Sequence, residues 1–153
     1  MLFRSRLTSD IPVVSEEDPG SISVGQGASC YWLIDPLDGT KEFINRNDEF
    51  TCNLALIEDH QPTLGFVSVP ALGLLYHGGP ACYSKRISRD GEITSLNPSQ
   101  QPGLTRVVAS KSHLNEETRA YIGAIGGEVE LVQAGSSLKF LKVAEGQIGR
   151  AHV

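Results

Sequence analysis

Two aspartates that follow an apolar run constrain this chain more than any other feature. They stand in the segment Asp35-Pro36-Leu37-Asp38-Gly39-Thr40, directly after residues 31–34, whose sequence Tyr-Trp-Leu-Ile predicts a buried strand. The strand is expected to end at a tight turn that carries both carboxylates, and residues 41–44 then begin like a helix. Backbone N–H groups at such a helix start favour a phosphate, so the segment predicts a divalent metal ion and a phosphate held at one point.

A second acidic segment, Ser15-Glu16-Glu17-Asp18-Pro19-Gly20, ends a short apolar run at residues 11–14. Its Pro-Gly pair predicts a turn, which places the two glutamates on the edge of a loop. Glu16 and Asp35 are too far apart in the sequence to meet within one element, so they meet only if the loop and the strand end are neighbours in a sheet. In that case Glu16, Asp35 and Asp38 supply hard oxygen ligands that suit Mg²⁺.

The turn itself adds further groups for this chemistry. Pro36 would keep the turn rigid and leave the Leu37 carbonyl free to point at a metal ion. Two ions would activate a water molecule and stabilise the leaving oxygen of an in-line displacement, with Glu16 and Thr40 orienting the water. Two simpler interpretations stay open, in which the aspartates are capping acids of an ordinary turn and the two adjacent glutamates are a solvated loop.

A different phosphatase chemistry uses a nucleophilic aspartate in the pattern Asp-x-Asp-Gly-Thr after an apolar strand, as in the haloacid dehalogenases. In this chain the two carboxylates are one residue further apart, so the second one would point the wrong way to act as the acid. The spacing therefore favours a water nucleophile over a covalent aspartyl-phosphate.

Two later segments combine hydroxyl groups with a cation. In Gly135-Ser136-Ser137-Leu138-Lys139, two serines and free N–H groups at a predicted helix start would form an anion pocket. The alternative for this segment is an ordinary N-cap with a surface lysine. Ser110-Lys111-Ser112-His113 follows a predicted strand and offers the same kinds of group, although a histidine in such a place is often a simple loop residue.

Composition limits the partners of the chain. Its formal net charge is −5, which argues against binding nucleic acid through a basic face. The same charge would repel an anionic substrate unless cations at the site reverse the local sign, which bound Mg²⁺ would do. Three cysteines without a C-x-x-C pair argue against a disulfide framework or a zinc ribbon and favour a reducing cytoplasm, and no apolar stretch is long enough to predict a transmembrane segment.

Strands dominate the first part of the chain, and helices alternate with strands after it. This order predicts a layered α+β protein, or an α/β protein, in two lobes at residues 6–98 and 103–147, with residues 97–103 as the linker. Asn115 would cap a helix that ends before Gly126-Gly127. The other predicted strands are residues 51–58, 63–69, 74–77, 81–86, 106–109 and 128–132, and a further helix begins at residues 135–137.

Taken together, these motifs resemble the inositol monophosphatase superfamily. The acidic loop at residues 15–19, the strand that ends in Asp-Pro-Leu-Asp-Gly-Thr, and the Gly-Ser-Ser-Leu-Lys-Phe stretch at residues 135–140 occur in that order, and the similarity extends over residues 11–147. The last stretch, and the Lys-Glu-Phe-Ile continuation at residues 41–44, resemble its CysQ-type branch, the 3'(2'),5'-bisphosphate nucleotidases.

The resemblance implies a layered αβαβα sugar-phosphatase fold and Mg²⁺-dependent hydrolysis of a phosphomonoester, with two or three ions in an intact enzyme. The implied substrate is a small nucleotide, adenosine 3',5'-bisphosphate, which would yield AMP and phosphate. The implied metal ligands are Glu16, Asp35, Asp38 and the Leu37 carbonyl. The implied catalytic residues are Glu16, Asp35 and Thr40, and the implied substrate contacts are Glu16, Asp38, Gly39, Thr40, Ser110, His113, Ser136 and Lys139.

The chain departs from the family pattern at both ends. The family begins with a pair of helices, and it has a Trp-Asp-x-Ala motif whose aspartate completes the second metal site. The single tryptophan of this chain is Trp32, so the sequence lacks that motif. Residues 1–5 and 148–153 match translated sequencing-adapter ends in one reading frame, which predicts non-native ends on a partial fold without the N-terminal helices and the C-terminal part.

Three other interpretations stay open at this point. The chain could derive from an inositol monophosphatase or another sugar phosphatase. It could also be a non-catalytic nucleotide-binding piece, which would fit the missing metal ligand. Finally, it could be a fragment that does not fold stably, because it lacks packing partners on two sides and exposes an apolar patch.

Overall fold

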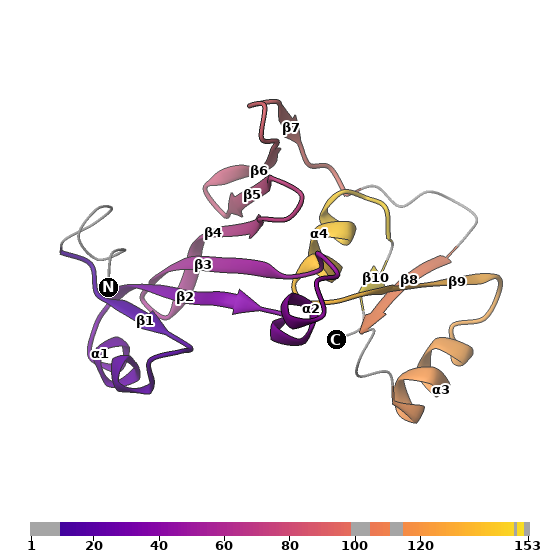
Figure 1. Ribbon diagram of the computed structural model, residues 1–153, viewed down its shortest axis with the longest axis horizontal. Helices are drawn as coiled ribbons and strands as arrows, with labels where there is room; N and C mark the ends of the chain where they lie inside the picture. Colours follow the sequence, from indigo (N-terminus) through magenta and orange to yellow (C-terminus); the bar gives the residue numbers. More distant parts are fainter. Residues whose placement is uncertain (1–9, 99–104, 111–114, 149, 152–153) are drawn as a thin grey trace.

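The computed structural model describes residues 10–98, 105–110, 115–148 and 150–151, and the chain forms two β-sheets in this part (Figure 1). The larger sheet follows the chain from one strand to the next, and only its first pair is parallel. Its strands are β1 (Val13–Ser15), β2 (Cys30–Asp38), β3 (Thr51–Glu58), β4 (Gln61–Val69), β5 (Leu74–Gly79), β6 (Cys82–Ile87) and β7 (Ile93–Ser95). The predicted strands of this region are thus confirmed as β3 to β6.

Tight turns explain why neighbouring strands of this sheet pair with one another. Asp59 and His60 both have positive φ, 47° and 64°, and they alone join β3 to β4. A two-residue loop of this conformation matches the twist of an antiparallel hairpin. The turn is shorter than the sequence indicated, because Pro62 lies inside β4, opposite Ile57 and next to a shift in the register.

The smaller sheet has the order β10-β8-β9, and its strands are parallel. These strands are β8 (Thr105–Ser110), β9 (Val129–Ala134) and β10 (Arg150–Ala151), and the crossovers contain α3 (Glu116–Ala124) and α4 (Leu138–Ala144). The side chain of Asn115 caps α3 by accepting a hydrogen bond from the Thr118 amide at 2.8 Å, as predicted. The helix ends before Gly126 and Gly127, which both have positive φ.

Helix α4 packs against both sheets and joins them into one structure (Figure 1). Leu141 is buried against Val69 and Tyr76 of the larger sheet. Leu138 contacts this cluster and also the cluster of the smaller sheet. The mixed sheets and the packed helix confirm the predicted α+β class.

Ile148 is buried with Val108 and Ala134, and β10 pairs with Val107 and Val108. The described residues after position 147 therefore contact the smaller sheet. Residues 1–5, the other predicted non-native end, lie outside the described residues.

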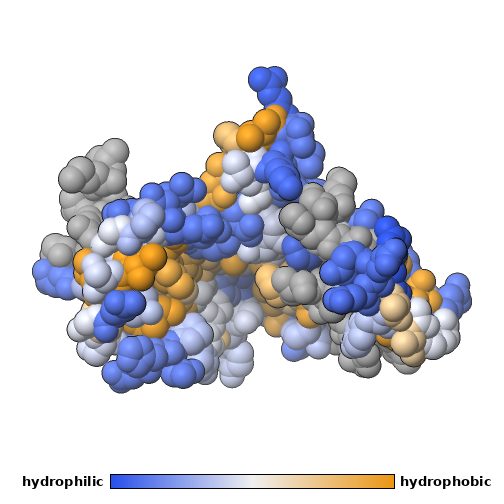
Figure 2. Space-filling view, turned by 90° about the horizontal axis from the view of Figure 1, so that it is seen from below, coloured by the Kyte–Doolittle hydropathy of each residue, from blue (hydrophilic) through white to orange (hydrophobic). Residues whose placement is uncertain are grey.

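Apolar side chains also reach the surface. Figure 2 shows hydrophobic residues gathered on one face of the molecule, near the end of the larger sheet that carries α1 (Ile22–Gln26). Exposed large hydrophobic residues in the first part of the chain are Ile22, Val24, Leu33, Phe43 and Ile44. None of the helices in the described ranges has the length and apolar character needed to cross a lipid bilayer.

Candidate metal and phosphate site

Parallel pairing of β1 with β2 brings the acidic loop to the acidic strand. Ser15 is the register partner of Ile34, and the Glu16 amide donates a hydrogen bond to the Ile34 carbonyl at 3.1 Å. Glu16 therefore follows directly alongside Asp35. The charge of Asp35 raises the pKa of Glu16, and partial desolvation, a hydrogen bond with Asp35 and the nearby charges of Glu17 and Asp38 act in the same direction.

A β-bulge places both aspartates of the turn motif on one face of the sheet. Asp35 pairs with Asn53 and Asp38 pairs with Thr51, so two residues of β2 stand opposite the single residue Cys52. In a regular strand, residues three positions apart point to opposite faces. The bulge corrects this, since the two partners on β3 are two positions apart. The prediction that the strand ends before Asp35 was wrong, because β2 continues to Asp38.

The backbone between the two aspartates is held by local hydrogen bonds. The Leu37 amide donates to Asp35 Oδ1 at 3.1 Å, and the Thr40 hydroxyl is 3.5 Å from the Leu37 carbonyl, at the long limit of a hydrogen bond. Gly39 has a φ of 90° and precedes the short helix α2 (Thr40–Ile44). The structure thus keeps the Leu37 carbonyl and the Thr40 hydroxyl close together beside Asp35.

The Asp38 carboxylate connects the two sheets. Its Oδ2 atom accepts hydrogen bonds from Thr51 Oγ1 at 3.3 Å and from Asn53 Nδ2 at 3.4 Å, both on β3. It also accepts a bond of 2.7 Å from Ser137 Oγ, just before α4. The sequence predicted Ser137 only as part of an anion pocket, and its contact with Asp38 depends on the packing of the two sheets.

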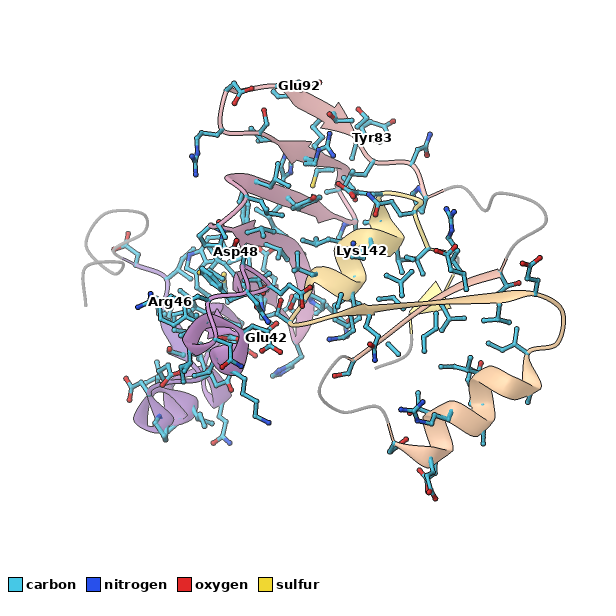
Figure 3. All side chains as sticks on the ribbon, turned by 45° about the vertical axis from the view of Figure 1, so that its right-hand side comes forward. Glu42, Arg46, Asp48, Tyr83, Glu92 and Lys142 are labelled. Atoms are coloured by element: carbon cyan, nitrogen blue, oxygen red, sulfur yellow. The ribbon has the colours of Figure 1, made fainter. Side chains whose placement is uncertain are left out.

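The turn before α4 packs against the turn before α2. A Cβ atom added to Gly39 would be 3.1 Å from the Cβ of Ser136 and 3.1 Å from the Glu49 carbonyl oxygen. One added to Gly135 would be only 2.7 Å from Glu42 Cγ, and the Gly135 amide donates to Glu49 Oε2 at 3.1 Å. Figure 3 shows Glu42, a residue of α2, beside the end of β9 that leads to this turn. At both positions a side chain would crowd the neighbouring segment, and the positive φ of Gly39 favours glycine there as well.

Two predicted substrate contacts, Lys139 and Ser110, lie near the turn before α4, one within that helix and one at the end of β8. Lys139 is buried, and its Nζ donates to the Ser136 carbonyl at 2.7 Å, so the alternative of a surface lysine was wrong. Ser110 ends β8 and is the register partner of Ala134, directly before Gly135. Ser110 therefore lies close to the turn in which Ser136 stands. His113 lies outside the described residues.

The carboxylates fit a hard divalent cation in their chemistry. The charges of Asp35 and Asp38 both act on Glu16, and that of Asp35 has the larger effect. A bound cation would relieve this repulsion between like charges. Among the described residues, however, no three acidic, histidine or cysteine side chains converge into a full metal centre. The described part of the chain thus provides two adjacent carboxylates, Glu16 and Asp35, with a third one, Asp38, nearby.

The fold and the site define an α+β protein with an acidic, oxygen-rich centre at a bulged strand, where a parallel sheet lies beside a mostly antiparallel one. The chain belongs to the inositol monophosphatase family, whose model matches residues 4–151.

Individual relatives and solved structures show which members of the family the chain is similar to. The chain is 46% identical over 141 residues to the 3'(2'),5'-bisphosphate nucleotidase CysQ of Salmonella typhimurium, and 44% identical to the same-named protein of Escherichia coli K12. These matches cover 92% of the chain but only 56% of either relative, so the chain spans about half their length. The crystal structure of CysQ from Bacteroides thetaiotaomicron superposes with a TM-score of 0.78 at 38% identity, over 91% of this chain and 58% of that one.

A more distant structure agrees in fold. Mycobacterium tuberculosis SuhB superposes with a TM-score of 0.72 at 18% identity, over 98% of this chain and 60% of that one. The predicted sugar-phosphatase type of fold, present in part, is thereby confirmed.

Proposed function

We propose that this chain is the metal- and phosphate-holding part of a Mg²⁺-dependent 3'(2'),5'-bisphosphate nucleotidase, which converts adenosine 3',5'-bisphosphate to AMP and phosphate. The observation that carries the proposal is the position of Glu16 beside Asp35, with Asp38 on the same face of the sheet as Asp35. The names of the relatives at 44–46% identity support the choice of substrate.

Each acidic residue has a stated role in this proposal. Glu16, Asp35, Asp38 and the Leu37 carbonyl would hold Mg²⁺, which when bound supplies positive charge and Lewis-acid activation. Glu16 and the Thr40 hydroxyl would orient the attacking water by hydrogen bonds. The position of Thr40 next to the Leu37 carbonyl supports this role.

The phosphate and the nucleotide would use the two packed turns. The backbone of Gly39 and Thr40 would hold the transferred phosphate. Ser136 and Lys139 would contact the nucleotide side, and Ser110 and His113 would do so from the end of β8. The proximity of Ser110, Ser136 and the turn before α2 supports this assignment for the described residues.

We also propose that residues 6–98 form the first lobe and residues 103–147 the start of a second one. The two separate sheets support this division. The metal-holding carboxylates would belong to the first lobe, and the second would supply the nucleotide contacts.

The test uses a hybrid in which residues 10–147 replace the matching segment of the Salmonella typhimurium relative. We expect Mg²⁺-dependent phosphate release from adenosine 3',5'-bisphosphate, and much slower release from inositol 1-phosphate. Preference for the inositol phosphate would instead support the sugar-phosphatase alternative. Binding of the nucleotide by calorimetry without turnover would support the non-catalytic one.

The variant Asp38→Asn tests the metal assignment in the same hybrid. We expect kcat/KM to fall by about a hundredfold or more, because a bound metal supplies several kcal/mol of transition-state stabilisation. Asp59→Asn is the matched control, since Asp59 is exposed in the turn between β3 and β4. Near-normal turnover of Asp38→Asn with Mg²⁺ would show that the assignment is wrong.

A further inference from the structure

One oxygen of the Asp38 carboxylate accepts every hydrogen bond that the described residues donate to this group. Oδ2 accepts from Thr51, Asn53 and Ser137 at 3.3, 3.4 and 2.7 Å, whereas Oδ1 has no hydrogen-bond partner among the described residues. A carboxylate held in this way by one oxygen keeps the lone pairs of the other for a cation. The shortest of the three bonds comes from a residue 99 positions away in the sequence.

The hydroxyl of Ser137 is itself fixed from a second side. Asn53 Nδ2 donates to Ser137 Oγ at 3.0 Å, and Ser137 Oγ donates onward to Asp38. The three side chains therefore form a closed set of hydrogen bonds. This arrangement allows the serine hydroxyl only one orientation, because it must accept from the amide and donate to the carboxylate.

A purely structural role as a helix cap does not explain this serine. Ser137 occupies the N-cap position of α4, where serine is favoured because its side chain usually accepts a backbone N–H. Here the side chain makes no capping hydrogen bond. Its hydroxyl is instead used entirely for the contact with Asp38 and Asn53.

We propose that Ser137 is a positioning residue that orients the Asp38 carboxylate for Mg²⁺ and so couples the metal site to the second sheet. The inference rests on the proposed function, in which Asp38 is a metal ligand. Groups that hydrogen-bond to metal-binding side chains orient them, and their loss typically costs about 10- to 100-fold in metal affinity. A hydrogen bond to a carboxylate is also stronger than one between neutral groups.

Calorimetric titration of the chain with Mg²⁺ tests the proposal without measuring turnover. We expect Ser137→Ala to raise the Kd for Mg²⁺ about tenfold or more, and Ser137→Thr, which keeps the hydroxyl, to restore most of the affinity. Ser68→Ala is the matched control, because Ser68 is a half-buried serine on β4 whose side chain makes no hydrogen bond within the described part of the chain. Its Kd should equal that of the unsubstituted chain.

The possible outcomes separate this inference from the proposed function. If the unsubstituted chain binds no Mg²⁺, both are overturned. If it binds Mg²⁺ and Ser137→Ala binds it equally well, only the role of Ser137 is overturned. A lower unfolding temperature of Ser137→Ala in EDTA with an unchanged Kd would also overturn it, since that pattern indicates a structural role. If the alanine variant does not fold, Ser137→Cys replaces it, because a thiol is similar in size but a weak donor.

Discussion

The two sheets of this molecule are built in different ways. In the larger sheet every strand pairs with its neighbours along the chain, mostly through short antiparallel turns. In the smaller sheet the strands are parallel, so each connection needs a crossover that contains a helix. The larger sheet and the residue directly after β1 supply the three carboxylates of the candidate site, whereas the crossover of the smaller sheet supplies Ser137, which donates a hydrogen bond to one of them. The three carboxylates thus come from strands that are neighbours in the sequence, whereas the hydrogen bond from Ser137 joins segments that are far apart in it.

The contact between the sheets depends on a few residues in α4 and on either side of it. Leu141 enters the core of the larger sheet. Beyond the last turn of the helix, Glu145 accepts hydrogen bonds from Tyr76 at 2.8 Å and from Arg86 at 3.0 Å. At its beginning, Gly135 permits the close approach to α2. Substitutions at these positions test how strongly the second sheet is held.

The largest expected effect on stability comes from Leu141→Ala. This substitution removes a buried side chain that packs on Val69 and Tyr76, so we expect a loss of about 2–5 kcal/mol in the free energy of unfolding. Phe140→Ala is the control on the same helix, because Phe140 is 51% exposed. Urea denaturation followed by circular dichroism measures both. Equal losses would show that α4 does not hold the sheets together through Leu141.

Gly135→Ala should lower the free energy of unfolding by less than Leu141→Ala does. An added Cβ would lie 2.7 Å from Glu42 Cγ and 3.1 Å from the Glu49 carbonyl oxygen, so the turn before α4 must move away from α2 and from the loop that follows α2. We expect a loss of about 1–3 kcal/mol, as for other cases of overpacking. Gly123→Ala in α3 is the control of opposite sign, because nothing lies within 4 Å of its added Cβ and alanine favours helix. A stabilising effect of Gly135→Ala in thermal unfolding would contradict the close packing.

Tyr76→Phe should have a smaller effect. The substitution removes the hydrogen bond from the Tyr76 hydroxyl to Glu145 but leaves the ring and the Arg86 ion pair in place. We expect a loss of about 1.5 kcal/mol, the lower end of the range for hydrogen bonds to charged groups, because this pair is only partly buried. Tyr83→Phe serves as the reference because Tyr83 is 87% exposed. If both variants unfold at the same urea concentration, the hydrogen bond does not stabilise the contact between the sheets.

The smallest effect concerns the pKa of Glu16. Asp35→Asn removes the charge that raises this pKa most, so it should fall toward the ordinary value of 4.5. Because a raised pKa means that the folded chain binds the proton more tightly than the unfolded one, stability decreases as pH rises through the range above 4.5. In Asp35→Asn this decrease should be weaker.

NMR titration of the Glu16 carboxyl carbon measures that change directly. Glu17→Gln is a useful comparison, since the charge of Glu17 acts more weakly on Glu16 than that of Asp35. A pKa that does not move in Asp35→Asn would mean that the two carboxylates are not neighbours in solution.

Many of the strands could be predicted because their signals are local, but β1 and β7 at the edges of the larger sheet were not predicted. Apolar runs between turn residues predicted β3 to β6, and a side-chain cap at Asn115 predicted the start of α3. The Asp-Pro-Leu-Asp-Gly-Thr motif also pointed to the candidate site, since acidic residues after an apolar strand are an unusual combination. The bulge in β2 was missed, because whether a strand stops or bulges depends on the strand that pairs with it.

The sequence alone identified the acidic groups, the glycines of the two turns and the change from successive strands to alternating helices and strands. These follow from residue type and spacing, which act over a few positions. Only the tertiary structure decided that Glu16 lies beside Asp35, that Asp35 and Asp38 share a face, and that the Ser137 hydroxyl binds the Asp38 carboxylate. The physical reason is that strand register and the packing of α4 depend on many weak contacts between distant segments, and no single motif encodes their sum.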